Sequence, residues 1–144
     1  MRRPAIVLAT LIVATLALSG CDVLAPTRDT SGNITMATEM PSTDARVKDC
    51  FTFVDGSDLA YATVLPCTEA HTHVVIARGT ITQAKIAEFE SLQIALITRC
   101  QPAVDAYLTE QDDDGTPEYI VSTKRKPNGN EVTNYSCLMK SAAP

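Results

Sequence analysis

The number and positions of the cysteines constrain this chain more than any other feature. The sequence holds five cysteines, an odd number that cannot all be paired within one chain. Four are spread through the later part of the sequence, whereas Cys21 closes an apolar N-terminal stretch. The chemistry of Cys21 therefore decides whether the other four can form a disulfide framework.

The N-terminal stretch resembles the signal of a bacterial lipoprotein. Two arginines precede an apolar segment from Ala5 to Ala17, which is too short for a bilayer that needs about 20 apolar residues. The run Leu18-Ser19-Gly20-Cys21 resembles the lipobox, whose cysteine receives a diacylglyceryl group and becomes the first mature residue. We predict a signal peptide over residues 1–20 and a membrane anchor of acyl chains, such as palmitate, on Cys21. The alternatives are an uncleaved anchor helix or a signal cleaved elsewhere.

The remaining cysteines form an even set in an exported protein, which favours two disulfides. Four cysteines allow three pairings. We prefer Cys50–Cys67, because these two lie near the adjoining ends of a predicted hairpin. The second pair, Cys100–Cys137, can form if a helix packs on the sheet. Each bridge is expected to stabilise the domain by about 3 kcal/mol.

The mature chain is expected to be acidic. Two of the 12 basic residues lie in the leader, so residues 21–144 hold 10 basic and 17 acidic residues, a formal charge of −7. This balance excludes a nucleic-acid partner, because no basic patch is available to displace counterions. There is also no polybasic stretch, so the acyl group is expected to supply the membrane affinity alone.

Residues 21–45 are predicted to be the lipidated cysteine and a flexible tether. The segment is rich in Ser and Thr, contains Pro26, Gly32 and Pro41, and shows no sustained hydrophobic periodicity. As a flexible coil it would reach about 27 Å root-mean-square. We therefore place the folded domain at residues 46–140.

Within that domain the pattern predicts an α+β fold. Strand-like segments with β-branched and aromatic residues occur at 47–54, 60–65, 73–77, 118–124 and 131–139. The sequence between the last two contains Asn128-Gly129, which is typical of a type I′ hairpin turn. The expected sheet is therefore antiparallel, has about five strands and is stabilised by disulfides.

One long helix is expected to pack on this sheet. Thr80-Ile81-Thr82-Gln83 fits a capping box, and apolar residues follow at helical spacing as far as Cys100. Pro102 is costly inside a helix but favoured at its first position. We therefore predict an interruption near Cys100-Gln101 and a short second helix over residues 102–108.

The densest group of chemically versatile residues is Cys67-Thr68-Glu69-Ala70-His71-Thr72-His73. In an extended segment His71 and His73 would share one face, and with Cys67 they could bind zinc. The disulfide prediction competes with this, because a bonded sulfur is not a thiolate. We predict no metal or other cofactor, and treat the two histidines as possible binding residues.

Other motifs that carry chemistry are weak. The acidic loop at 110–115 matches part of a calcium-binding loop, but position twelve would be Val121 where a bidentate Glu is needed. There is no G-x-S-x-G element, no convincing catalytic triad and no phosphate-binding Gly-rich loop. We therefore expect a protein that is not an enzyme.

The cysteine-bearing segments contain short recognisable patterns, which are Val47-Lys48-Asp49-Cys50-Phe51, Pro66-Cys67-Thr68-Glu69-Ala70-His71, and the later Cys100 and Cys137. In these patterns the chain resembles the septum-formation domain family of small actinobacterial exported proteins and lipoproteins. A related lipoprotein pattern, C-x-x-x-V-D-A-Y, resembles residues 100–107. The resemblance covers residues 46–139 and implies a link to the cell envelope and division, but no catalytic residues.

Together these patterns predict a lipoprotein on the extracytoplasmic face of the cell membrane. Its expected role is a non-enzymatic module that binds an envelope protein or cell-wall partner. The alternatives are an enzyme or accessory subunit of an envelope complex that uses His71 and His73, or a carrier of a small ligand or metal.

Overall fold

A six-stranded antiparallel sheet and one long helix make up the fold. The computed structural model describes residues 25–111 and 115–141. In chain order the elements are β1 (Thr38–Pro41), the 3-10 turn η1 (Ser42–Asp44), β2 (Cys50–Phe53), β3 (Tyr61–Leu65), β4 (His73–Thr82), α1 (Gln83–Ile86), α2 (Leu92–Gln111), β5 (Thr116–Arg125) and β6 (Glu131–Lys140). The strand order is β1-β3-β2-β4-β6-β5. The α+β class is therefore confirmed, with six strands rather than five.

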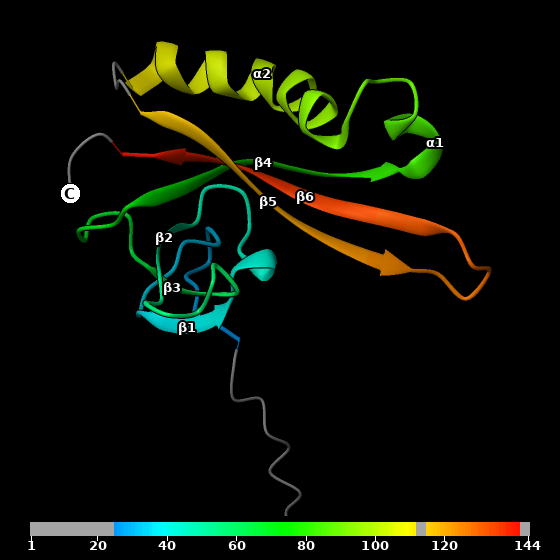
Figure 1. Cartoon of the computed structure of the whole chain (residues 1–144). Coiled ribbons are helices and arrows are strands. Elements are labelled where there is room, and N and C mark those ends of the chain that lie inside the picture. Colours follow the sequence, from blue (N-terminus) through cyan, green and yellow to red (C-terminus); the bar gives the residue numbers. More distant parts are fainter. Residues whose placement is uncertain (1–24, 112–114, 142–144) are drawn as a thin grey trace, which may run out of the picture.

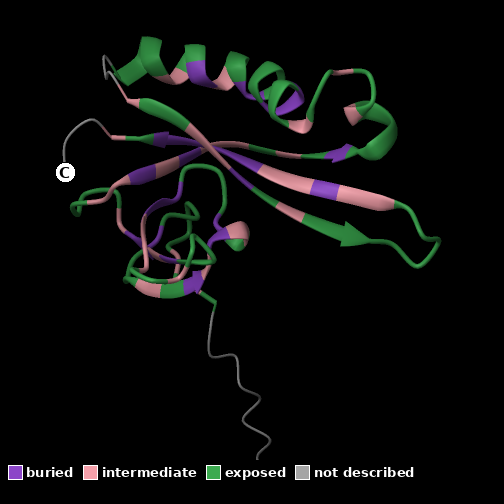
Figure 2. Ribbon diagram, viewed as in Figure 1, coloured by how far each residue is buried: buried purple, intermediate pink, exposed green. Residues whose placement is uncertain are grey.

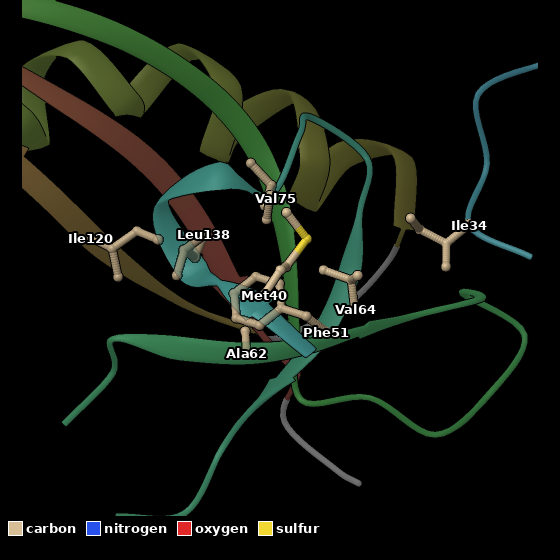
Figure 3. Packing of buried hydrophobic residues seen from close by; sticks show 9 residues of the cluster. Ile34, Met40, Phe51, Ala62, Val64, Val75, Ile120 and Leu138 are labelled. Carbon is tan, nitrogen blue, oxygen red and sulfur yellow. The ribbon is translucent and has the colours of Figure 1, made fainter. Parts of the chain in front are cut away.

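The sheet curls so that its two edge strands contribute to the same core. In Figure 1, α2 covers one side of the long strands β4, β6 and β5, and the short strands β1 to β3 lie on the other side. Met40 from one edge strand and Ile120 from the other belong to a single buried cluster around Phe51 and Leu138 (Figure 3). The apolar faces of the two ends of the sheet are thus buried against each other.

Strand β6 is buried on both of its faces. Four consecutive residues, Ser136–Met139, are buried, which is the pattern of a strand covered on two sides. Figure 2 shows that α2 turns its buried residues toward the sheet and exposes its outer surface. In the pairing of β4 with β6, Gly79 lies opposite Tyr135, and a Cβ at Gly79 would lie 2.6 Å from the Tyr135 Cζ. The glycine therefore makes room for the tyrosine ring.

The β5–β6 turn differs from the predicted type I′ form. Within this turn only Gly129 has a positive φ, of 81°. Its amide donates to the Lys126 carbonyl at 2.9 Å, and the Lys126 amide donates to the Asn130 carbonyl at 2.8 Å. This is the pattern of a three-residue loop whose last residue is left-handed.

The helical region is interrupted where the sequence did not predict it. β4 continues through Thr82, so Thr80 lies in a strand, and Thr82 caps the one-turn α1 instead by accepting from the Lys85 amide. Helical structure resumes at α2, where the Ser91 hydroxyl just before the helix accepts a hydrogen bond of 3.2 Å from the Ile94 amide. The predicted interruption at Cys100-Gln101 is wrong, because α2 runs unbroken through Pro102.

Tertiary packing explains why Pro102 is tolerated. An interior proline costs roughly 3 kcal/mol because it removes one helical hydrogen bond. Pro102 is exposed, so water can solvate the carbonyl that loses its donor. On either side, Cys100 is bonded to β6 and Val104 is buried. These contacts hold both halves of the helix on the sheet.

Both predicted disulfides are confirmed. Cys50 and Cys67 are bonded with their Cα atoms 5.2 Å apart, and they join β2 to the segment that follows β3. Cys100 and Cys137 are bonded with their Cα atoms 5.7 Å apart, and they join α2 to β6. One bridge therefore closes the short hairpin, and the other fixes the helix on the sheet.

The predicted tether is wrong for most of its length. Strand β1 pairs with β3, and Ile34, Met40 and Ala45 are buried in the core. Arg28 donates two hydrogen bonds of 2.7 Å to the carboxylate of Asp49, whose side chain is only 3% exposed. This pairing, which we call the Arg28–Asp49 clasp, fixes the start of the segment to the domain. The folded unit therefore begins before residue 46.

Candidate functional site

The two sequence-predicted histidines lie in different environments. His73 begins β4 and is buried, with its ring stacked on Phe51 at a centroid distance of 5.3 Å and edge-on to Phe53 at 4.8 Å. Its Nε2 donates to the Glu118 carboxylate at 3.1 Å, and Nδ1 lies 2.7 Å from the Thr72 hydroxyl. Both ring nitrogens are therefore occupied within the protein.

His71 does not share this environment, because β4 begins only at His73. The segment before the strand is irregular, and His71 Nδ1 lies 2.8 Å from the Glu69 carbonyl. Its ring is partly exposed and lies on the wall of a surface groove. The predicted shared face of His71 and His73 is thus wrong, since alternation applies only to extended backbone.

Burial lowers the pKa of His73 below its ordinary value of 6.5, and the nearby Glu118 opposes this shift only in part. At pH values between the folded and unfolded pKa of His73, the unfolded chain binds more protons than the folded chain. The stability that neutral His73 contributes is therefore complete above pH 6.5 and is lost as the pH falls through the folded pKa. We expect the free energy of unfolding to fall as the pH drops below 6.5.

Urea denaturation at several pH values checks this expectation. His73→Gln should flatten the dependence over this window, because it removes the titrating ring. Glu118→Gln should enlarge the loss, because Glu118 raises the pKa of His73. An unchanged slope in His73→Gln would assign the effect to other groups.

The groove beside His71, here called the disulfide groove, has a volume of about 650 Å³, which is within the usual range for ligand sites. Its walls come from the turn before β2, the segment before β4, β4 itself and the second half of α2. Most of the lining is apolar or small, and Lys48, His71, Glu110 and Gln111 add polar groups. The lining includes Val47, Lys48, the Cys50–Cys67 bridge, His71, Ala103, Ala106 and Tyr107.

The wall formed by Lys48 is rigid. Its backbone is left-handed, with φ at 74°, a conformation that favours glycine. The Lys48 amide donates to the Val75 carbonyl at 2.8 Å. The Cys67 sulfur lies 3.5 Å from the Lys48 carbonyl oxygen. This is a van der Waals contact and not a hydrogen bond, because the sulfur is in the disulfide and carries no proton. The bridge and β4 thus hold the backbone of Lys48 in place at the groove wall.

Sequence reasoning identified only part of this groove. It found Cys67 and His71, and the C-x-x-x-V-D-A-Y pattern contains Ala103, Ala106 and Tyr107. Their spacing places these three on one side of α2, which is the signal that could have pointed to them. Val47 and Lys48 belong to the Val47-Lys48-Asp49-Cys50-Phe51 segment, but nothing in that segment indicated a groove, because only the fold brings their turn beside the helix.

A second cavity, of about 600 Å³, lies between β1 with η1 and β5. It is bordered by exposed apolar side chains such as Leu59, Tyr61 and Val121. None of the sequence motifs contributes to it. We therefore take the disulfide groove, which contains both His71 and a disulfide, as the candidate site.

The residues predicted as possible zinc ligands are not available to bind a metal together. Cys67 is bonded to Cys50, and His73 is occupied by Thr72 and Glu118. Among residues 25–111 and 115–141, no group of three or more His, Cys, Asp or Glu side chains is placed to hold a metal ion. The central aspartates of the predicted calcium loop, residues 112–114, lie outside the described residues.

Comparison with known proteins identifies no relative of this chain. No protein-family model, curated protein or solved structure matches this chain. The lipobox and Cys21 lie outside the described residues. Within the described part of the chain, no helix is both long and apolar enough to cross a membrane.

Proposed function

We propose that this protein is an exported lipoprotein, anchored through Cys21 to the outer face of the cell membrane, that binds an envelope protein or cell-wall partner without catalysing a reaction. The disulfide groove is the observation that carries this proposal. It combines apolar walls with a few polar groups, as binding sites commonly do. A role in the cell envelope or division follows from the resemblance to the septum-formation domain family.

An enzyme or metal carrier that uses both histidines is the alternative. It would need His71 and His73 to act on one ligand. The ring of His73 is enclosed by Phe51 and Phe53, whereas His71 faces the groove. Binding through the groove, with His71 at its wall, is therefore the better supported function.

Photo-crosslinking in the native membrane tests this proposal. We expect p-benzoylphenylalanine at position 71 to capture a specific neighbour, because His71 lines the groove. The same probe at Ile97 should not, since Ile97 is exposed on α2 but lies outside the groove.

A groove-filling variant makes the test specific. Ala106 is exposed and lines the groove, so Ala106→Trp should fill it without disturbing the core. We expect at least about tenfold weaker capture, equivalent to about 1.4 kcal/mol. Ile97→Trp is the matched control. Capture that is equal in both variants, or no specific neighbour at all, would contradict the proposal.

A further inference from the structure

The turn before β2 presents an unusual surface. The Asp49 amide donates to the Arg46 carbonyl at 3.0 Å, and the Asp49 carboxylate accepts from the Arg46 amide at 2.7 Å. Between them, Lys48 is left-handed where such a turn favours glycine. The fold therefore holds a lysine in a strained position, a feature that is often associated with function.

Three consecutive side chains of this turn face solvent. Val47 is 46% exposed and lies between the exposed residues Arg46 and Lys48. Among the described residues neither cation forms an ion pair, and the adjacent Asp49 is already neutralised by Arg28. An apolar side chain between two unpaired cations suits the interface of an anionic bilayer.

The Arg28–Asp49 clasp also brings the turn close to the residues that follow the predicted anchor. Arg28 binds the same Asp49 carboxylate that closes the turn, so the chain is fixed beside the turn only seven residues after Cys21. Seven residues span at most about 25 Å. The side chains of Arg28 and Asp49, which separate the backbone of Arg28 from the turn, are together shorter than this span. Cys21 can therefore reach the same surface as the turn.

We propose that the Arg46–Lys48 turn contacts the anionic bilayer in which Cys21 is anchored. Val47 lies at the level of the headgroups, and Arg46 and Lys48 bind their phosphates. The inference rests on the proposed lipid anchor. Two cations are too few to hold the protein on their own, so the contact orients a domain that the acyl chains already retain.

A single tryptophan can report this contact, because the chain has none. The full lipidated chain carrying Val47→Trp is placed in vesicles of phosphatidylcholine with phosphatidylglycerol. We expect the emission to shift to shorter wavelength and to be quenched by lipids brominated in their acyl chains. Val121→Trp is the matched control, because Val121 is 44% exposed but lies on β5; its emission should not change.

The charge requirement is tested in the Val47→Trp background. Lys48→Gly removes the cation while keeping a residue that tolerates the left-handed backbone, so the fold is retained. We expect weaker quenching in this variant and in vesicles without phosphatidylglycerol. Quenching that is insensitive to both changes would overturn the headgroup contact.

Vesicle flotation separates this inference from the anchor. If the Val47→Trp protein floats with the vesicles but its tryptophan stays unquenched, the inference fails while the lipid anchor stands. If the protein does not float, both fail. An emission shift that requires an envelope protein and not the vesicles would identify the turn as a protein contact and overturn the bilayer proposal.

Discussion

Asp49→Ala is expected to lower the free energy of unfolding by about 3–5 kcal/mol, because it leaves the charge of Arg28 poorly solvated and unpaired. The Arg28 side chain is only 12% exposed, and two hydrogen bonds of 2.7 Å join it to Asp49. The substitution also removes the acceptor of the Arg46 amide. Urea denaturation measures the loss, provided that the m-value is unchanged.

Two further variants isolate the contribution of the clasp. Arg28→Leu leaves Asp49 as a buried charge without its partner but keeps the acceptor for Arg46, so its loss should be of similar size. Arg125→Ala removes an ion pair to Glu131 that is 73% and 35% exposed on its two sides, and should cost at most about 1 kcal/mol. Equal small losses in Arg28→Leu and Arg125→Ala would show that the Arg28–Asp49 clasp does not stabilise the domain.

Removal of the second disulfide should have an effect of comparable size. Cys100→Ala with Cys137→Ala opens a loop between residues 37 positions apart, which corresponds to about 4 kcal/mol in the chain-entropy model. Both cysteines are fully buried, so the change also leaves space beneath α2. We expect reduced protection of α2 amides in hydrogen exchange, together with a lower urea midpoint.

The other disulfide is the natural comparison. Cys50→Ala with Cys67→Ala opens a loop between residues 17 positions apart and should cost about 3 kcal/mol, since the closed loop is shorter. Its effect should be concentrated at β2 and the wall of the disulfide groove. Unchanged exchange in α2 after loss of Cys100–Cys137 would mean that this bridge does not hold the helix on the sheet.

Features encoded by neighbouring residues were predictable. The segments of β2 to β6 alternate or concentrate β-branched residues, and they form strands close to their predicted positions. Cys50 lies at the start of one hairpin strand and Cys67 just beyond the end of the next, so the first disulfide follows from hairpin geometry. The second followed from the expectation that the helix packs on the last strand.

Features that depend on distant partners were not predictable. Ile34 and Met40 are isolated apolar residues in a Ser- and Thr-rich segment, and Arg28 pairs with Asp49, which lies 21 positions further along the chain. The continuity of α2 through Pro102 depends on packing on both sides of the proline. His73 does not share the exposed face of His71, because Phe51 and Phe53 of β2 enclose its ring.

The mass of the N-terminal peptide from the membrane fraction shows directly whether Cys21 is the membrane anchor. We expect a peptide that begins at Cys21 and carries a diacylglyceryl group, and we expect Cys21→Ala to release the folded protein from the membrane. Unmodified Cys21 in a protein that remains fully membrane-bound would contradict the lipid anchor.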